Sequence, residues 1–212
     1  HRYHHSVQLA KSIIDSKEYG EVINLRGVYG KSQLVTFGQD EWRTQRSIAG
    51  GGVLLDQGIH MLDLILLFAG PFDEIRSFIS RSHWPYDVED NAYVLMKNTD
   101  TGVVAFLNSS ATQWKHRFHL EITLQRGSLI LSGFLTHSKS YGDETLTVME
   151  SNPEVDKGCP KEISYKFVDD PSWDAEILEF VESIKTGAPV VAGSLIEAKT
   201  ALEHVFRIYG AD

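Results

Sequence analysis

The chain has 212 residues, of which 42% are hydrophobic and 23% are charged, a balance typical of a folded globular domain and not of a disordered or fibrous chain. Lys and Arg number 20 against 29 Asp and Glu, so the formal net charge is −9. Because no block of basic residues is present, the composition argues against nucleic acid or an anionic membrane as a partner. A single cysteine, Cys159, excludes an intrachain disulfide and favours a reducing compartment, which we take to be the cytoplasm.

No apolar run reaches the length of about 18 residues that a helix needs to cross a membrane, and no signal peptide is visible. The chain starts with HRYHHSV, without an initiator Met, and reads like the middle of a longer protein. We therefore expect a further segment to precede residue 1.

A helix is predicted first, because apolar residues follow Ser6 at helical spacing as far as Ile14 and the Ser6 hydroxyl can cap the helix. A strand follows in residues 21–30, and residues 30–49 are polar and irregular. A second helix is expected over residues 51–68, where a Gly-Pro pair ends it.

The middle of the chain alternates apolar and polar residues with a period of two, which is typical of half-buried strands. The turn-forming sequences NTDTG and QRG separate neighbouring segments. The predicted strands are 72–80, 91–98, 102–112, 116–125 and 127–133, with 145–150 and 162–168 as two further candidates on either side of a surface loop.

Two helices close the chain, in residues 172–187 and 194–210. Ser172 and Ser194 stand at their N-cap positions, and Glu197 follows Ser194 at the spacing of a capping box. The order of elements predicts an α+β fold, in which a large, mixed but mostly antiparallel sheet carries helices on one face. No linker divides the chain, so it is expected to form one domain.

The second helix carries three polar side chains, Asp56, His60 and Asp63, among apolar residues. Each helical residue advances by about 100°, so residues three and four apart lie on one face. A buried carboxylate needs a partner or access to a polar cleft. The pattern indicates an imidazole general base, His60, with the Asp56 carboxylate orienting it or tuning its pKa.

Two other interpretations fit the same spacing. In a purely structural one, Asp56 and Asp63 bridge neighbouring loops and His60 is a core histidine. In the other, D-x3-H-x2-D places three metal ligands on one face, as in a metal-dependent hydrolase or isomerase, although such sites usually need a further ligand. Cys159 lies in a polar, turn-like stretch, which argues against a nucleophilic role.

Three consecutive glycines, Gly50 to Gly52, precede this helix. A dinucleotide-binding turn needs G-x-G-x-x-G directly after a buried apolar strand. Here Leu55 takes the place of the last glycine, and no apolar strand precedes the run. The glycines are therefore expected to allow close backbone approach by a ligand or another chain segment, or to make the loop flexible.

Two motifs resemble the C-terminal domain of the Gfo/Idh/MocA oxidoreductases. The first is Trp42-Arg43 followed by G-G-G-x-x-x-D-x-G-x-H-x-x-D in residues 50–63. The second, HRYHHSVQLAKSIIDSKEYGEV at the start of the chain, is similar to the family's crossover segment between two domains, with His5 where the family has proline. The strand-rich middle and the two closing helices fit as well, so the resemblance covers nearly the whole chain.

The resemblance implies that residues 1–212, with a crossover helix in 1–18, are the substrate-binding and acid/base domain of an oxidoreductase that uses NAD or NADP. The substrate would be a sugar, a cyclitol or a related hydroxyl compound. By this resemblance His60 is the general acid/base, and Asp56 supports it or contacts the substrate. Arg43 and Trp42 line the substrate pocket. Arg2 and Tyr3 approach the cofactor, and Asp63 has a structural role.

The chain lacks the family's N-terminal Rossmann domain and its Glu-Lys-Pro element, whose Lys assists at the substrate hydroxyl. Because the cofactor carries the redox chemistry, we expect no bound cofactor and no dehydrogenase activity for this chain alone. The resemblance also implies that sheets pack face to face in a homo-oligomer. A non-enzymatic oligomerisation or scaffold module built on the same sheet is the alternative function.

Overall fold

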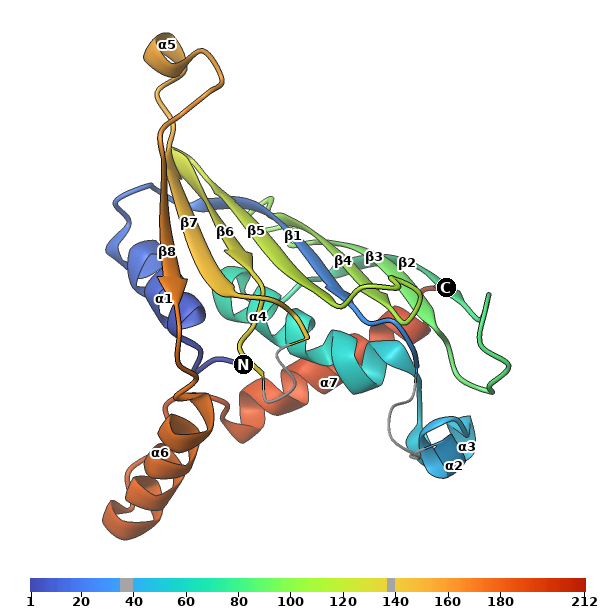
Figure 1. Cartoon of the computed structure of the whole chain (residues 1–212). Helices are drawn as coiled ribbons and strands as arrows, with labels where there is room; N and C mark the ends of the chain where they lie inside the picture. The colour runs from blue at the N-terminus through green and yellow to red at the C-terminus, as the bar shows by residue number, and fades with distance from the viewer. Residues whose placement is uncertain (35–39, 137–139) are drawn as a thin grey trace.

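An eight-stranded sheet forms the body of the protein, counted over residues 1–34, 40–136 and 140–212, which the computed structural model describes (Figure 1). Its strands are β1 (Val22–Gly30), β2 (Glu74–Ser80), β3 (Asn91–Lys97), β4 (Val104–Ser110), β5 (Arg117–Leu124), β6 (Gly127–Ser132), β7 (Glu144–Glu150) and β8 (Glu162–Phe167). They lie in the order β2-β3-β4-β1-β5-β6-β7-β8. β1 runs parallel to β4, and the other neighbouring pairs are antiparallel.

Helices cover one face of the sheet. The helical elements are α1 (His5–Ser16), α2 (Asp40–Arg43), α3 (Arg46–Ala49), the π-helix η1 (Leu54–Gly58), α4 (Ile59–Ala69), α5 (Pro153–Asp156), α6 (Ser172–Thr186) and α7 (Leu195–Tyr209). α4 packs on β1 and β4, α7 on α4 and β2, and α1 on β6, β7 and β8, whereas α6 projects away from the sheet (Figure 1). This arrangement confirms the predicted α+β fold.

The core lies between α4 and the inner face of the sheet. Met61, Leu64 and Ile65 of α4 are fully buried, and burial of each such side chain contributes about 1.5–3 kcal/mol. Gly27 of β1 permits the close approach, because a Cβ atom there would lie 2.7 Å from Cγ of Met61. Polar residues interrupt the stretch Arg46–Ala69, but by length and mean hydropathy it could cross a membrane. Of its most apolar 18-residue window, 61% is buried inside the structure, as in a core helix of a globular protein.

The second helix is not the continuous one predicted over residues 51–68. The π-helix η1 occupies its first part, and α4 follows directly. Residues 30–49, predicted to be irregular, contain the short helices α2 and α3. A π-helical turn holds an extra residue, is rare and occurs frequently at functional sites. Hydrophobic spacing does not reveal it, because the same face stays apolar on both sides of the turn.

Two of the three predicted N-caps are wrong. α1 begins at His5 without a side-chain cap, and Ser6 lies inside its first turn. Ser172 is the first residue of α6 and not its cap. Ser194 does cap α7, and it exchanges hydrogen bonds with Glu197 in the predicted capping box.

Glu89, just before β3, holds the start of η1 against the sheet. It is 1% exposed, and its carboxylate accepts hydrogen bonds from the backbone N–H groups of Gly52 at 2.7 Å and Leu54 at 3.0 Å and from the Tyr209 hydroxyl at 2.8 Å. A Cβ atom on Gly52 would lie 2.1 Å from the backbone oxygen of Glu89. At Gly52 the glycine run therefore serves the close approach of another chain segment, one of its predicted roles.

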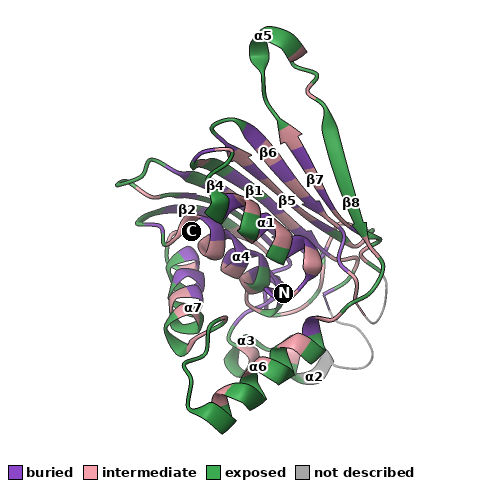
Figure 2. Ribbon diagram, turned by 90° about the vertical axis from the view of Figure 1, so that its left-hand side faces the viewer, coloured by how far each residue is buried: buried purple, intermediate pink, exposed green. Residues whose placement is uncertain are grey.

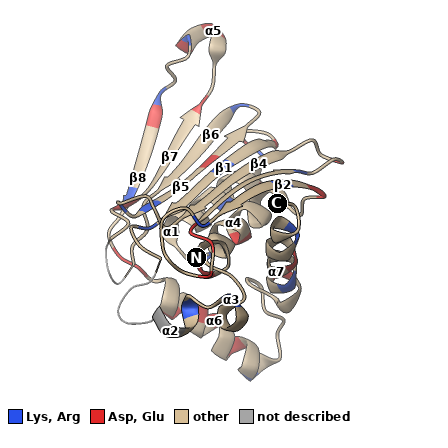
Figure 3. Ribbon diagram, turned by 90° about the vertical axis from the view of Figure 1, so that its right-hand side faces the viewer, with Lys and Arg blue, Asp and Glu red and all other residues tan. Residues whose placement is uncertain are grey.

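The opposite face of the sheet carries exposed apolar side chains on β2, β3 and β4. Phe78 pairs in register with Tyr93, and Leu95 pairs with Phe106. Phe78 is 78% exposed and Leu95 is 54% exposed. The same face of β2 and β3 also carries the charged side chains Glu74, Arg76 and Lys97. Figure 3 shows further charged residues on β8, on α7 and in the loops. We call Phe78, Tyr93, Leu95, Val104 and Phe106 the outer sheet patch.

We predict that Gly52→Ala lowers the free energy of unfolding by about 3 kcal/mol, because the added methyl group must displace the backbone of Glu89. Chemical denaturation followed by circular dichroism measures the change. The matched control is Gly210→Ala, where an added Cβ would meet no atom closer than 3.6 Å and φ is −83°. The control should alter stability by less than about 0.5 kcal/mol, and equal stability of the two variants would contradict the close approach.

Candidate functional site

Three adjoining hollows meet at His60 on the helix-covered side of the sheet. The first lies toward α2, the second toward the start of α6 and the third toward the end of β1, with volumes of about 300, 550 and 620 Å³. Asp56 lines the first and the third together with His60. The structure therefore brings four of the predicted site residues together, namely His60, Asp56, Arg43 and Trp42.

The Asp56 carboxylate lies between two cations. Lys31 Nζ donates to one oxygen at 2.9 Å, and Arg43 Nη1 donates to the other at 3.0 Å. The Arg43 guanidinium also lies 4.8 Å from the ring centre of Trp42, which is 49% exposed. Asp56 thus directs its hydrogen bonds to Lys31 and Arg43, and it acts on His60 through its charge.

The His60 imidazole stacks on the ring of His1, with ring centres 4.5 Å apart and an angle of 20° between the ring planes. Burial by the surrounding protein lowers the pKa of His60 below its ordinary value of 6.5, while the charges of Asp56 and Asp63 oppose the shift. Part of the side chain stays open to solvent in the hollows. His60 is therefore mainly neutral near pH 7 and can accept a proton.

Polar side chains from β1, η1 and the loops beside them line the third hollow. Tyr29 Oη lies 2.9 Å from Nε2 of His1, and Gln57 donates a hydrogen bond to the Tyr141 hydroxyl. Burial raises the pKa of Tyr29, so its hydroxyl keeps the proton. His116 lines the same hollow. Hydroxyl, amide and imidazole groups converging on one concave surface suit a ligand with several hydroxyl groups.

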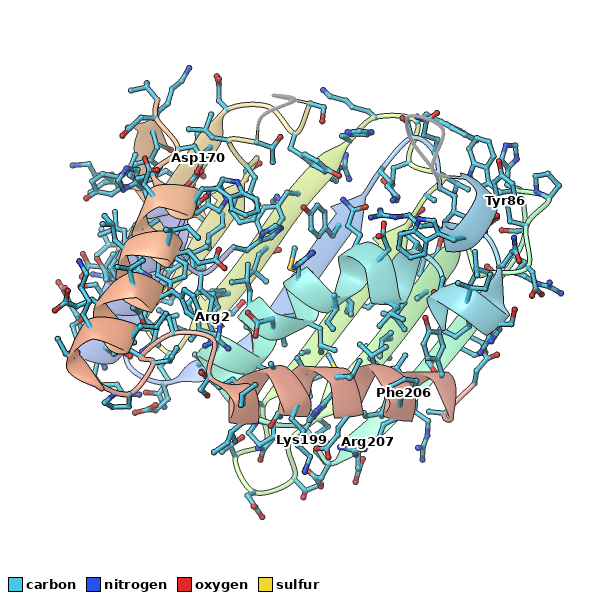
Figure 4. All side chains as sticks on the ribbon, turned by 90° about the horizontal axis from the view of Figure 1, so that it is seen from below. Arg2, Tyr86, Asp170, Lys199, Phe206 and Arg207 are labelled. Atoms are coloured by element: carbon cyan, nitrogen blue, oxygen red, sulfur yellow. The ribbon has the colours of Figure 1, made fainter. Side chains whose placement is uncertain are left out.

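Arg2 joins the N-terminal segment to α4 and α7 (Figure 4). It is 7% exposed, donates two hydrogen bonds of 2.8 Å to the Asp63 carboxylate and pairs with Glu197. Although partial burial raises the pKa of Glu197, hydrogen bonds from Arg2 and Ser194 hold it at about 2. Asp63 therefore anchors α4, as the resemblance implies, and contact of Arg2 with a cofactor stays a prediction.

Tyr3 joins the same segment to α6. Its hydroxyl donates to Glu179 at 2.8 Å, and Glu179 also accepts hydrogen bonds from the backbone N–H groups of Val191 and Ala192. Burial, and then Glu179, raise the pKa of Tyr3 to about 12. Tyr3 thus fixes α6 and the loop after it relative to the site, and its predicted approach to a cofactor remains to be tested.

The described residues do not form a cradle for the phosphates of a dinucleotide at the glycine run, because Glu89 already takes the N–H groups of Gly52 and Leu54. The metal interpretation also lacks support. Asp56 and Asp63 are each paired with cationic side chains. Across residues 1–34, 40–136 and 140–212, no group of three His, Cys, Asp or Glu side chains is placed to hold a metal ion.

The sequence alone does not identify Lys31, His1, Tyr29 and Tyr141 as site residues. Lys31 directly follows β1, and a polar residue at a strand end is a signal that could have indicated it. Tyr29 points inward by strand alternation, and a buried tyrosine hydroxyl needs a partner. Nothing in the spacing predicts that His1 or Tyr141 reaches the second helix, because both contacts are long-range.

The sequence model of the GFO/IDH/MocA C-terminal domain matches residues 7–130. Levoglucosan dehydrogenase from Pseudarthrobacter phenanthrenivorans is 32% identical over 80 residues, which are 35% of this chain and 20% of that protein. The chain therefore spans only a part of this curated relative.

Two solved structures show the same fold over 99% of this chain at 19% identity. Levoglucosan dehydrogenase in complex with NADH and levoglucosan has a TM-score of 0.80, and the chain covers 61% of it. Aldose-aldose oxidoreductase from Caulobacter crescentus, complexed with glycerol, has a TM-score of 0.79, and the chain covers 59% of it. At this identity the likeness concerns the fold alone.

We predict that Arg2→Ala lowers the free energy of unfolding by about 3 kcal/mol, because it leaves the carboxylates of Asp63 and Glu197 without their partner. Urea denaturation measures the loss. Arg81→Ala is the control, since Arg81 is exposed and lies 3.4 Å from Asp87, and it should cost less than about 1 kcal/mol.

The loss in Arg2→Ala should shrink in acid. The folded pKa of Glu197 lies below its ordinary value of 4.5, so its ionised form stabilises the fold above pH 4.5, and this contribution disappears as the pH falls through about 2. A difference between wild type and variant that stays constant down to about pH 2 would show that the ion pair is not its source.

Proposed function

Since this chain belongs to the Gfo/Idh/MocA family of oxidoreductases through its C-terminal domain, we propose that it is the substrate-binding and acid/base part of a nicotinamide-dependent oxidoreductase. Its substrate is a sugar, a cyclitol or a related hydroxyl compound, and the whole protein uses NAD or NADP in the cytoplasm. Structures of levoglucosan dehydrogenase with NADH and either levoglucosan or L-sorbose support this proposal. The chain alone is inactive in this proposal, because the cofactor carries the redox chemistry.

The position of His60 is the observation that carries the proposal. Its imidazole lies where the three hollows meet, has a lowered pKa and stays open to solvent. During oxidation of an alcohol, the neutral ring accepts the proton of the reacting hydroxyl, and during reduction the protonated ring returns it. The hydride is exchanged with the nicotinamide, which is held by the part of the protein outside this chain.

Asp56, Lys31 and Arg43 present one acceptor and two donors beside His60. Their contacts with one another fix the geometry before a ligand arrives, because each cation is held on one oxygen of the carboxylate. Substrate hydroxyl groups can donate to Asp56 and accept from Lys31 or Arg43. Trp42 supplies an exposed apolar wall next to Arg43.

One side of α6 is the proposed contact surface for the nucleotide-binding part. Trp173, Ile177, Phe180 and Ile184 recur at helical spacing and are 56–72% exposed. Figure 2 shows α6 almost wholly exposed and away from the sheet. Trp173 lines the same hollow as His60. A domain that rests on this side of α6 therefore also covers the acid/base group.

The outer sheet patch is the proposed contact between two copies of the chain. Its apolar side chains lie on three adjacent strands, so a second sheet can cover them face to face. The same patch favours the second candidate function, a non-enzymatic oligomerisation or scaffold module. Activity in the whole protein distinguishes the two functions.

We predict that His60→Gln in the full-length protein lowers kcat/KM for a sugar alcohol by at least about 100-fold, because glutamine does not exchange protons near pH 7. Steady-state reduction of NAD or NADP measures it. His119→Gln on β5, which does not line the three hollows, is the matched control and should keep wild-type activity.

The pH dependence of kcat/KM in the wild-type protein should show the ionisation of His60. Because the pKa of His60 is lowered, kcat/KM for oxidation should rise through a pKa below 6.5 and be level above it. The lowered pKa also means that the folded state binds fewer protons than the unfolded state, so stability falls as the pH drops below 6.5. If kcat/KM for oxidation rises through a pKa above 6.5, or if the same rise persists in His60→Gln, His60 is not the acid/base group.

We predict that Ile177→Asp in the full-length protein weakens the contact across α6, because it places a charge in an apolar interface. Faster cleavage between the two parts in limited proteolysis and a roughly tenfold lower kcat/KM are expected. Leu178→Asp is the matched control, since Leu178 is 68% exposed but lies on another side of the helix. If both variants resist proteolysis equally well, α6 is not part of the interface.

We predict that Phe78→Glu converts a dimer of this chain into a monomer, because the charge cannot be buried in the outer sheet patch without a partner. Size-exclusion chromatography with light scattering measures the mass. Val155→Glu on α5 is the control, because Val155 is 73% exposed and lies outside the patch. A wild-type monomer at high concentration would contradict the proposed oligomer.

A further inference from the structure

His1 is held in place more firmly than a residue of a loose terminal segment. Its Nε2 lies 2.9 Å from Tyr29 Oη, the ring of Phe134 meets it edge-on with ring centres 4.8 Å apart, and its face lies on His60. The contacts come from β1, from the segment after β6 and from α4. The His1 ring is therefore enclosed on several sides, and His60 occupies one of its faces.

The neighbours of His1 fix the segment that carries it. His4 meets the His1 ring edge-on and is hydrogen-bonded through Nδ1 to Glu144 at 2.8 Å. Glu144 is 1% exposed and also accepts the backbone N–H of Ser6 at 2.9 Å. Together with the bidentate pair of Arg2, these contacts leave the segment little freedom to move the His1 ring off His60.

The contact with Tyr29 suits one tautomer of the His1 ring. Burial keeps the proton on Tyr29, so the hydroxyl can donate to Nε2 of His1. A ring nitrogen that accepts a hydrogen bond carries no proton, and the remaining proton then lies on Nδ1. In this tautomer the His1 ring is neutral, and its face lies on His60.

We propose that His1 is a positioning residue for His60, whose neutral ring, oriented by Tyr29, holds the acid/base imidazole in one orientation and stabilises its protonated form. This inference rests on the proposed acid/base function of His60. The face of a neutral aromatic ring attracts a cation, whereas two protonated rings 4.5 Å apart repel each other. At most one of the stacked imidazoles can therefore be cationic at a time, and in this proposal the hydrogen bond from Tyr29 makes His60 that ring.

Other charged and titratable groups also surround His60, and each remains unchanged in the variants used below. On its own helical segment these are Asp56 and Asp63. From the elements around it they are Tyr3, His4, Lys31, Arg43, His116, Tyr141, Asp170 and Glu176.

The kinetic test compares His1→Ala with His1→Phe in the full-length protein. Alanine removes the stacked ring, so kcat should fall about tenfold while KM changes less than about twofold, because the acid/base group is misplaced but the substrate contacts remain. Phenylalanine keeps a stacked face and should restore kcat to within about threefold of wild type. Loss of kcat in both variants to the same degree, or in neither, would overturn the proposal.

A titration separates this inference from the proposed function, because it needs no catalysis. The ring protons of His60 are followed by NMR in the 212-residue chain, with His60→Gln for assignment. His1→Phe should raise the titration midpoint of His60, since a competing base is removed and a cation-attracting face is kept. Tyr29→Phe should lower it, since His1 is then free to take a proton and repel one on His60.

A purely structural role of His1 predicts no such opposite shifts, and unchanged midpoints in both variants would refute the inference. If His60→Gln leaves full-length activity intact while the opposite shifts are seen, the stack exists but the acid/base function fails. If His60→Gln abolishes activity and the midpoints do not move, the function stands and the role of His1 is wrong.

Discussion

The buried carboxylate of Glu89 is the contact on which the geometry of the site depends. It has no cationic partner among its hydrogen bonds in the described part of the chain, and it is satisfied by two backbone N–H groups at the start of η1 and by the Tyr209 hydroxyl. Leaving such a group unpaired costs several kcal/mol. Because Asp56 follows Leu54 by two residues, this anchor sets the position of the Asp56 carboxylate, which lines two of the hollows beside His60.

A second anchor acts beyond His60. Arg2 binds Asp63 in a bidentate pair and reaches Glu197 at the start of α7, so the helical segment is fixed on both sides of the acid/base residue. His60 itself is held differently, by the face of the His1 ring. An ion pair would fix its charge, whereas a ring contact orients the imidazole and leaves it free to change protonation state. The arrangement separates the ion pairs that build the site from the imidazole for which we propose proton transfer.

The elements that follow from local pattern are those that the sequence predicts well. Alternation along β2 to β7 and the apolar faces of α1, α4 and α7 reflect burial on one side. The capping box at Ser194 is a contact between residues three apart. The π-helix η1 escapes prediction, because an extra residue in one turn leaves the apolar face unchanged. Lys31 and Tyr29 reach Asp56 and His1 only through the pairing of β1 inside the sheet, and such long-range contacts leave no periodic trace.

Two apolar surfaces are exposed, the outer sheet patch and one side of α6, and their positions argue for different partners. The outer sheet patch lies on the face of the sheet opposite α4, so whatever covers it leaves the hollows around His60 open. The apolar side of α6 adjoins a hollow that His60 and Trp173 share, so whatever covers this side of α6 also removes water from around His60. Removal of water strengthens the electrostatic effect of Asp56 and the stacked ring on proton transfer. The cofactor-bearing domain proposed for α6 and the second copy proposed for the sheet would therefore cover different surfaces and would not compete for the same site.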